Sequence, residues 1–134
     1  MPIIPFSLLI SLSLHTMRGV TLISTVEVLQ EAIYRVNKRF NLHLPAKSVI
    51  ILVVVYKSCI ASGGISQLQV CFRLDKTHNQ VSRAGTVAIL SRLIQKGLVV
   101  KKKEGVCLIY SVTLQGSNYI QYFERTLREV RQKF

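Results

Sequence analysis

The chain has 134 residues, of which 49% are hydrophobic, and it carries 18 Lys and Arg against 6 Asp and Glu, for a net charge of +12. This length and composition suffice for the core of one domain. The charge favours a polyanionic partner, because so many cations repel one another unless phosphates or, less often, anionic lipid headgroups lie against them. The six acids are dispersed and form no pair, and no Ser-His-Asp arrangement or glycine-rich phosphate loop is present, so we expect no enzyme activity.

The residue types that bind metals or form disulfides are scattered along the chain. They are Cys59, Cys71, Cys107, His15, His43 and His78. Each cysteine lies inside an apolar segment and none forms a CxxC pair, which predicts reduced core residues of a cytoplasmic protein. The histidines lack metal-ligand spacing with the cysteines. We therefore expect no metal and no cofactor.

Residues 1–19 are apolar and almost uncharged. They lack a positive region before Phe6, lack a small-residue cleavage site, and have an apolar run that is too short for a membrane span. We therefore expect no membrane partner. Two interpretations stay open: an extension that packs on the domain or on a dimer partner, or an upstream segment before a natural start at Met17.

Residues 20–134 are predicted to form one domain that begins with a long amphipathic helix over residues 21–40. Its apolar stripe is Ile23, Val26, Leu29, Ala32, Ile33, Val36 and Phe40. Glu31 and Arg35 have the i,i+4 spacing of an exposed ion pair. The apolar face is larger than a small domain needs, which leaves room for a second subunit.

A second helix is predicted to begin after Pro45, which suits a helix start. Residues 49–56 are rich in β-branched residues and would form a buried strand on propensity alone. The run from Pro45 to Ala61 is long for a strand, so we predict a buried helix followed by a loop at residues 62–64.

A short helix over residues 66–74 is predicted next, with Leu68, Cys71 and Phe72 facing inward. Residues 75–77 form the predicted turn. Thr77 and Gln80 then have the spacing of a capping box for a helix that begins near His78.

This helix is predicted to continue to Lys96 and to end at Gly97, with Val87, Leu90, Leu93 and Ile94 in its apolar pattern. One continuous helix would turn Val81 to solvent and Arg83 toward the core. Either the helix kinks near Gly85, or a separate short turn of helix precedes it.

A basic hairpin and a final helix complete the chain. The hairpin has strands at residues 98–100 and 106–113, with Lys101, Lys102 and Lys103 before a tight turn at Glu104-Gly105. The final helix spans residues 115–133 and has an apolar stripe that Tyr119 and Tyr122 flank. That stripe is Ile120, Phe123, Leu127 and Val130.

This order of elements resembles the winged helix-turn-helix of the multiple-antibiotic-resistance regulator (MarR) family. The resemblance covers about residues 21–134 and depends most on Leu90, Leu93, residues 96–99 and residues 111–116. It implies a mainly α fold with a small β-hairpin wing (α+β), a winged core at about residues 45–113, and dimerisation helices at about 21–40 and 115–133. It further implies a homodimer that binds double-stranded DNA, and a small-molecule effector held between the dimerisation helices and the winged core.

The helix before Gly97 would then enter the major groove while the wings grip the backbone. We expect DNA contacts from His78, Asn79, Gln80, Ser82, Arg83, Arg92, Lys101, Lys102 and Lys103. The resemblance is imperfect: the family carries Ser, Thr and Arg where this chain has Ala84, Gly85, Val87 and Ala88. The alternative is a winged-helix accessory module of a replication, partition or transfer complex, which docks this non-polar face on protein or binds DNA without sequence preference.

Overall fold

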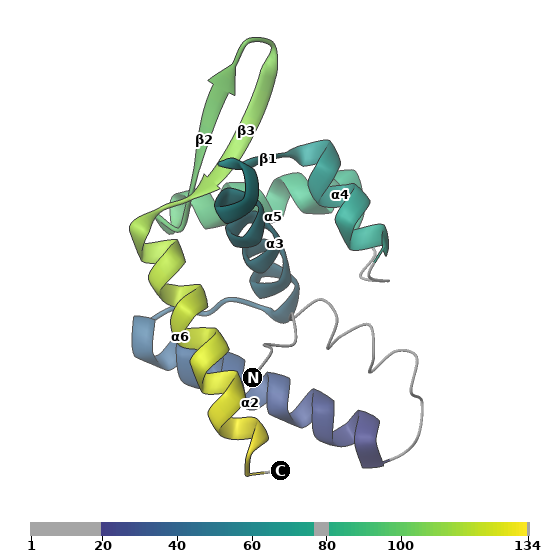
Figure 1. Cartoon of the computed structure of the whole chain (residues 1–134), viewed down its shortest axis with the longest axis vertical. Helices are drawn as coiled ribbons and strands as arrows, with labels where there is room; N and C mark the ends of the chain where they lie inside the picture. The colour runs from purple at the N-terminus through teal and green to yellow at the C-terminus, as the bar shows by residue number, and fades with distance from the viewer. Residues whose placement is uncertain (1–19, 77–80, 134) are drawn as a thin grey trace.

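The computed structural model describes residues 20–76 and 81–133, with side chains described from Thr25 onward except that of Lys76. The helices are α2 (Val20–Phe40), α3 (Ala46–Ser62), α4 (Gln67–Lys76), α5 (Arg83–Gln95) and α6 (Leu114–Arg131), and the strands are β1 (Ile65–Ser66), β2 (Val99–Glu104) and β3 (Cys107–Val112) (Figure 1). The expectations for residues 1–19, the Thr77–Gln80 capping box, and His78 and Asn79 lie outside the described residues.

Helix α3 runs through the centre of the molecule (Figure 1). It contacts α5, α6, α4, α2 and the sheet, and Val49, Ile51, Leu52 and Val55 are fully buried. Its β-branched run is therefore helical, as predicted, and it is apolar on most sides because other elements surround it. The helix ends at Gly63, whose φ of 85° allows its N–H to bond to the Cys59 carbonyl.

Helices α2 and α6 cross as a pair at the end of the molecule away from the wing (Figure 1). The apolar face of α2 contributes Val28, Ala32, Ile33 and Val36 to the core, and Arg35 pairs with Glu31 at 2.9 Å as predicted.

Two residues of this pair differ from the predicted pattern. Val26 is 42% exposed although the apolar stripe includes it, and Tyr119, predicted to flank the stripe of α6, is fully buried. The stripe itself is confirmed for Ile120, Phe123 and Val130, which are also fully buried.

Helix α4 has a different inward face from the predicted one. Val70 and Leu74 are buried, whereas Leu68 and Phe72 are 63% and 58% exposed. Strand β1, which pairs with β3 through Ile65 and Tyr110, is too short to leave a pattern in the sequence. Ile65 is buried in this strand, and α4 begins only at Gln67.

Helix α5 begins at Arg83, and the prediction of one continuous helix from near His78 is wrong because residues 81 and 82 are not helical. The alternative, a separate short turn of helix before it, falls on residues 77–80 and lies outside the described residues. The Ser82 hydroxyl accepts a hydrogen bond from the Gly85 N–H at 2.9 Å and caps the helix. The break in phase is therefore at Ser82, and Gly85 lies inside the helix. Leu90 and Leu93 are buried as predicted.

The inward face of α5 also includes a residue that the apolar pattern missed. Thr86 is buried and its hydroxyl donates a hydrogen bond to the Ser82 carbonyl at 3.0 Å, whereas Val87, predicted inward, is 39% exposed.

Strands β2 and β3 form the antiparallel wing, and β1 lies on the other side of β3. The hairpin turns at Gly105, which has a φ of 62°. Cys107 is exposed on the wing and Cys59 and Cys71 are half-buried, so the prediction of core cysteines is wrong. All three are free thiols.

Candidate nucleic-acid interface

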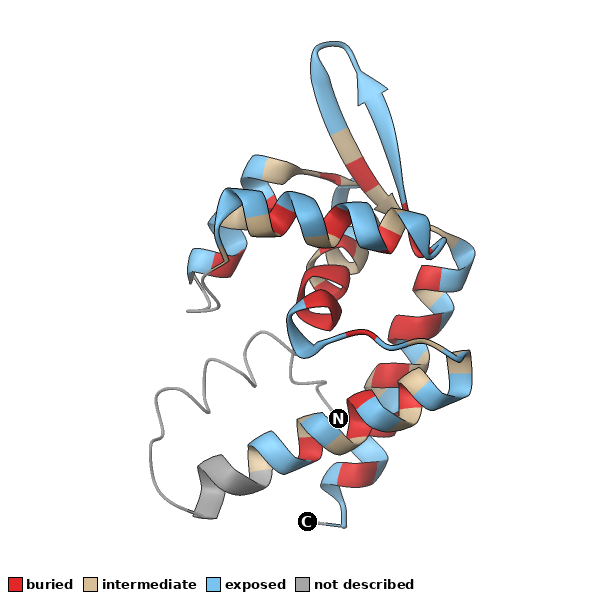
Figure 2. Cartoon of the chain, turned by 180° about the vertical axis from the view of Figure 1, so that it is seen from behind, coloured by how far each residue is buried: buried red, intermediate tan, exposed pale blue. Residues whose placement is uncertain are grey.

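One side of α5 packs on the core and the other is open to solvent (Figure 2). Along the open side, exposed residues recur at i, i+4, i+7 and i+11, the spacing of a single helical face. They are Ala84, Ala88, Ser91 and Gln95, with Val87 and Arg92 at the two margins. Ser91 and Gln95 offer hydrogen-bonding groups and the alanines offer methyl groups, which together match the hydrogen-bonding edges of bases and the thymine methyl.

The N-terminus of α5 adds cationic character at one end of this face. Arg83 is the first residue of the helix and is exposed beside the Ser82 cap. The first N–H groups of a helix carry a partial positive charge, so this end favours phosphate. Arg92, in the last turn, is exposed and adds a second cation near the other end.

The wing projects beyond the helices (Figure 1), and its outer half is exposed (Figure 2). Residues 101–103 are exposed on β2, opposite Tyr110, Ile109 and Leu108 of β3. Because side chains alternate along a strand, Lys101 and Lys103 lie on the face of Tyr110, and Lys102 lies on the other face. The three lysines therefore surround the wing instead of forming one flat patch.

Charge along α5 and the wing is predominantly positive. Residues 81–113 contain six Lys and Arg and one acid, Glu104. Within residues 20–76 and 81–133, Arg35 and Lys57 form ion pairs with carboxylates, whereas no cation of α5 or the wing forms one. The cations of α5 and the wing can therefore meet phosphates without first breaking such a pair.

Helix α5 and the wing are fixed to each other at the start of α6. The Thr113 hydroxyl donates to the Gly97 carbonyl at 2.6 Å, and the Thr113 N–H bonds to the Leu98 carbonyl at 3.0 Å. Gly116 lies so close to Leu98 that a Cβ there would collide with its carbonyl oxygen. The short link after α5, the wing and α6 thus meet in one tight joint.

The structure places six of the predicted DNA-contacting residues at exposed positions on α5, its cap and the wing. These are Ser82, Arg83, Arg92, Lys101, Lys102 and Lys103, although the Ser82 hydroxyl already serves as the cap. Sequence reasoning missed Ser91 and Gln95, because the predicted helix start and phase are misplaced. A serine at position 82, directly before the helical pattern, is a typical N-cap and was the signal that could have corrected the phase.

The described residues contain no group of three or more His, Cys, Asp or Glu able to hold a metal ion. Among the same residues, none of the helices has the length and apolar content that crossing a membrane requires.

Solved structures with the same arrangement are known. MepR, a transcription regulator of the Staphylococcus aureus multidrug efflux pump MepA, matches with a TM-score of 0.65 and 14% identity over 81% of this chain and 74% of that chain. The multiple antibiotic-resistance repressor MarR from Listeria monocytogenes 4b F2365 matches with a TM-score of 0.57 and 18% identity over 84% and 73% of the two chains. The chain has a MarR-like winged-helix fold.

A third structure with the MarR-like fold is CouR from Rhodococcus jostii RHA1 bound to p-coumaroyl-CoA, with a TM-score of 0.60 and 16% identity over 86% of this chain and 75% of that chain. Against RV1404 from Mycobacterium tuberculosis, the match covers only 64% of that longer chain. No protein-family model and no curated protein matched the sequence. The likeness is therefore one of fold.

Proposed function

We propose that the protein is a DNA-binding transcriptional regulator that acts in the cytoplasm as a homodimer and recognises a specific duplex sequence. The observation that carries this proposal is the open face of α5, which stands beside a projecting wing that is rich in lysine. A helix of this width fits the major groove, and the wing then lies along the adjacent backbone.

Each part of the surface has a distinct role in this proposal. Ser91 and Gln95 read base edges, and Ala84 and Ala88 contact thymine methyl groups. Arg83 and Arg92, at the two ends of α5, contact phosphate or guanine, and the N–H groups near the Ser82 cap receive a phosphate.

Residues 78–80, which precede α5, are also predicted to contact bases. His78, Asn79 and Gln80 stay predicted contacts, since the segment leads directly into the exposed end of the helix. Gln and Asn pair best with adenine.

Lys101, Lys102 and Lys103 supply affinity that does not depend on sequence. Because they lie on both faces of the wing, they can meet the phosphates on either side of a groove.

Selection from random-sequence duplex DNA tests the proposal, because a protein of +12 binds almost any DNA at low salt and affinity alone decides little. We expect an enriched palindromic sequence that is preferred over its scrambled version at physiological salt. No enrichment, with equal and salt-sensitive binding of both duplexes, would refute sequence-specific regulation.

A second candidate is an accessory winged helix that docks on protein or binds DNA without sequence preference. Two exposed valines favour it, Val87 on α5 at 39% and Val106 at the wing turn at 96%. An apolar contact of this kind is typical of a protein partner. Retained binding of scrambled DNA together with no enriched sequence would favour this candidate.

A small-molecule effector is also part of the proposal. CouR, which has the same fold, is bound to p-coumaroyl-CoA in its crystal structure. An effector of this chain would alter DNA binding by favouring one arrangement of the α2 and α6 pair relative to α5.

A further inference from the structure

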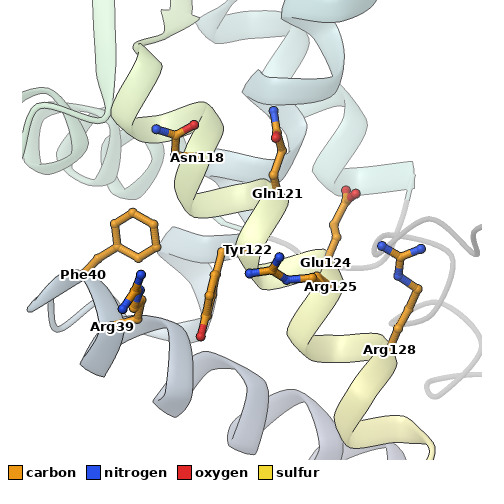
Figure 3. A pocket seen from close by; sticks show the side chains of 8 residues that line it. All are labelled: Arg39, Phe40, Asn118, Gln121, Tyr122, Glu124, Arg125 and Arg128. Carbon is orange, nitrogen blue, oxygen red and sulfur yellow. The ribbon is translucent and has the colours of Figure 1, made fainter.

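A hollow of about 480 Å³ lies where the C-terminal end of α2 meets the outward face of α6 (Figure 3). Arg39 and Phe40 line it from α2, and a row of exposed residues lines it from α6. The row is Asn118, Gln121, Arg125 and Arg128, which recur at intervals of three and four and so share one face of the helix. It is about 15 Å long, which suits a segment of polypeptide lying along the helix.

The Tyr122 ring fills the space between two arginines of the hollow (Figure 3). The guanidinium carbon of Arg125 is 5.0 Å from the centre of the ring, and that of Arg39 is 5.8 Å from it. Phe40 contacts the same ring edge-on, with centroids 6.0 Å apart. Cation–π attraction therefore holds two arginines from different helices on one ring, while both remain exposed and can donate N–H groups outward. A partner would lie across this surface and not between the side chains.

The cations of the hollow have no acidic partner of their own. In the part of the chain that the structure describes, no carboxylate lies within ion-pair distance of Arg39, Arg125 or Arg128. The acid that lines the hollow, Glu124, is 3.5 Å from Lys57 of α3, which offsets its charge. Three exposed guanidiniums around one hollow repel one another, and carboxylates laid over them would relieve that repulsion.

The DNA-binding face leaves most of the excess charge without a partner. Residues 81–113 contain six of the 18 Lys and Arg and one of the 6 acids, so twelve cations and five acids lie elsewhere in the chain. A second negatively charged partner, bound away from α5 and the wing, would balance this charge.

The composition of the hollow favours a polypeptide over a nucleic acid. Tyrosine and arginine are enriched at the energetic centres of protein interfaces, and Phe40 adds an apolar wall. The amides of Asn118 and Gln121 offer both donors and acceptors, which match a peptide backbone. Glu124 would repel a nucleic acid, in which every link is charged, whereas a polypeptide can place an uncharged residue beside it.

We propose that this hollow is a docking site for an acidic, amphipathic segment of another protein. The segment places carboxylates on Arg39, Arg125 and Arg128 and an apolar side chain against Phe40 and Tyr122. The proposal goes beyond DNA binding, because the site lies on the α2 and α6 pair, at the end of the molecule away from α5 and the wing (Figure 1). DNA held by α5 would leave it open. A second copy of the chain is a poor occupant, since two-fold symmetry would bring the arginines of both copies together.

Amide NMR of the full-length protein at physiological salt, without DNA, tests the proposal with a designed probe. The probe is a capped helical peptide of about 15 residues, long enough to span the α6 row, with glutamates along one side and leucines beside them. One control peptide has the same residues in scrambled order, and another has Gln in place of each Glu. We expect saturable shifts centred on residues 39–40 and 118–128 for the probe. Both controls should bind at least about tenfold more weakly, because one loses the pattern of charge and the other loses the charge.

Variants locate the site. Arg39→Gln and Arg125→Gln should each weaken probe binding about tenfold, the effect expected for one charge-assisted contact. Tyr122→Phe keeps the ring and should bind normally, whereas Tyr122→Leu should bind more weakly because the arginines are no longer supported by an aromatic ring. Arg131→Gln is the matched control, since it removes the same charge from an exposed position of α6 outside the hollow.

Glu124→Gln should change binding in the opposite direction. It removes a negative charge from the hollow and releases Lys57 from its ion pair, so the acidic probe should bind several-fold more tightly. A general disturbance of the fold would not strengthen binding. Weaker binding of the probe in this variant would contradict the placement of carboxylates in the hollow.

Four further results would overturn the proposal. The first three are the absence of saturable shifts with the probe, shifts centred on the wing lysines, and an equal loss of binding in Arg125→Gln and Arg131→Gln. The fourth is tighter binding of single-stranded oligothymidine than of the probe at residues 118–128, which would make the hollow a nucleic-acid contact. Since peptide binding is measured without DNA, it can fail while the duplex selection succeeds, and the reverse.

Discussion

Asn37 connects three parts of the chain through one side-chain amide. Its Nδ2 donates to the Leu44 carbonyl at 3.0 Å, and its Oδ1 accepts from the Leu44 N–H at 3.2 Å and from the Tyr119 hydroxyl at 2.8 Å. The amide thereby joins α2, the loop before α3 and α6. Tyr119 is fully buried, so this hydrogen bond satisfies a hydroxyl that water cannot reach.

The first prediction concerns Tyr119→Phe. Below pH 10 the variant should be less stable by about 1 kcal/mol, because it lacks the hydrogen bond to Asn37. Burial raises the pKa of the Tyr119 hydroxyl above its ordinary value of 10.0, so the native chain keeps the hydroxyl neutral where the unfolded chain ionises it. The stability that Tyr119 provides is therefore full below pH 10 and is lost as the pH rises above it.

Urea unfolding at several pH values, from neutral to about 11, checks this prediction. The difference in unfolding free energy between wild type and Tyr119→Phe should narrow above pH 10. Because both proteins contain the same lysines, the effect of lysine titration cancels in this difference. A constant gap across the range would mean that the hydroxyl is not held neutral by burial.

Gly116 gives the second prediction. Replacing glycine by alanine inside a helix usually stabilises a protein by about 1 kcal/mol. At this position the new Cβ would collide with the Leu98 carbonyl oxygen, and overpacking costs about 1–3 kcal/mol. We therefore expect Gly116→Ala to destabilise the protein by about 1 kcal/mol or more in urea unfolding. Gln115→Ala, at the adjacent exposed position, is the control and should change stability little. Stabilisation by Gly116→Ala would contradict the prediction, because it would show that α6 can move away from Leu98 to make room for the new Cβ.

Single residues are the part of the fold that the sequence predicts least well. Tyr119 was expected beside its apolar stripe, and its burial depends on Asn37, which is 82 positions away in the chain. A hydrogen bond between residues so far apart leaves no periodic signal. The same is true of Gly116, whose close approach to Leu98 is a matter of tertiary packing.

At the scale of elements, periodicity predicted the long helices and failed for short ones. Helices α2 and α6 have many turns, so a stripe of apolar residues identifies their inner faces. Helix α4 has only ten residues, too few turns for its apolar residues to mark one inner face clearly. Leu68 and Phe72 were therefore predicted to face inward although Val70 and Leu74 face the core.

Of the candidate interface, local sequence patterns predicted the wing and missed part of the open face of α5. The lysines of the wing adjoin a local turn signal, so sequence patterns alone located them. Ser91 and Gln95 were missed because the exposed face of α5 depends on its true start at Arg83, which the Ser82 cap determines.

The third prediction concerns the wing as an element. Changing Lys101, Lys102 and Lys103 to Gln should weaken the binding of all duplexes. The fall of log K with log salt concentration should also become less steep, by up to about 0.9 for each phosphate that the variant no longer neutralises. Fluorescence anisotropy at several salt concentrations measures that slope. Thermal unfolding should hardly change, because the three side chains are exposed.

Its control removes equal charge at the other end of the molecule, through Arg128→Gln, Arg131→Gln and Lys133→Gln. The slope of this control should stay close to that of wild type. Equal slopes in the two triple variants would show that total charge, and not the wing, determines DNA affinity.

As a whole, the molecule has two ends with different chemistry (Figure 1). The open face of α5 and the basic wing occupy one end, and the α2 and α6 pair with its arginine-lined hollow occupies the other. Helix α6 joins them, since it begins at the joint with Leu98 and its outward face lines the hollow. The order of elements and their MarR-like fold could be predicted from the sequence, but the hollow could not, because it forms between residues of α2 and α6 that are distant in the chain.

The fourth prediction concerns assembly of the whole molecule. The inner faces of α2 and α6 are used within the chain, which leaves the outer face of α2, with Val26 and Tyr34 exposed, for a second copy. We expect a dimer in sedimentation experiments and a monomer for Val26→Glu combined with Tyr34→Glu, because buried carboxylates without partners are strongly unfavourable. Ile60→Glu, at an exposed apolar position of α3, should stay dimeric; a monomeric wild type would contradict the prediction.

The central claim is that the open face of α5 reads DNA sequence, and one measurement tests it most directly. The preference for a selected duplex over its scrambled version is measured at physiological salt for wild type, for Ser91→Ala with Gln95→Ala, and for Ser117→Ala with Gln121→Ala. The two pairs have the same residue types and the same spacing, on α5 and on α6. We expect the α5 pair to reduce the preference about tenfold or more, as for one or two base contacts, and the α6 pair to keep it. An undiminished preference in the α5 pair would contradict the claim.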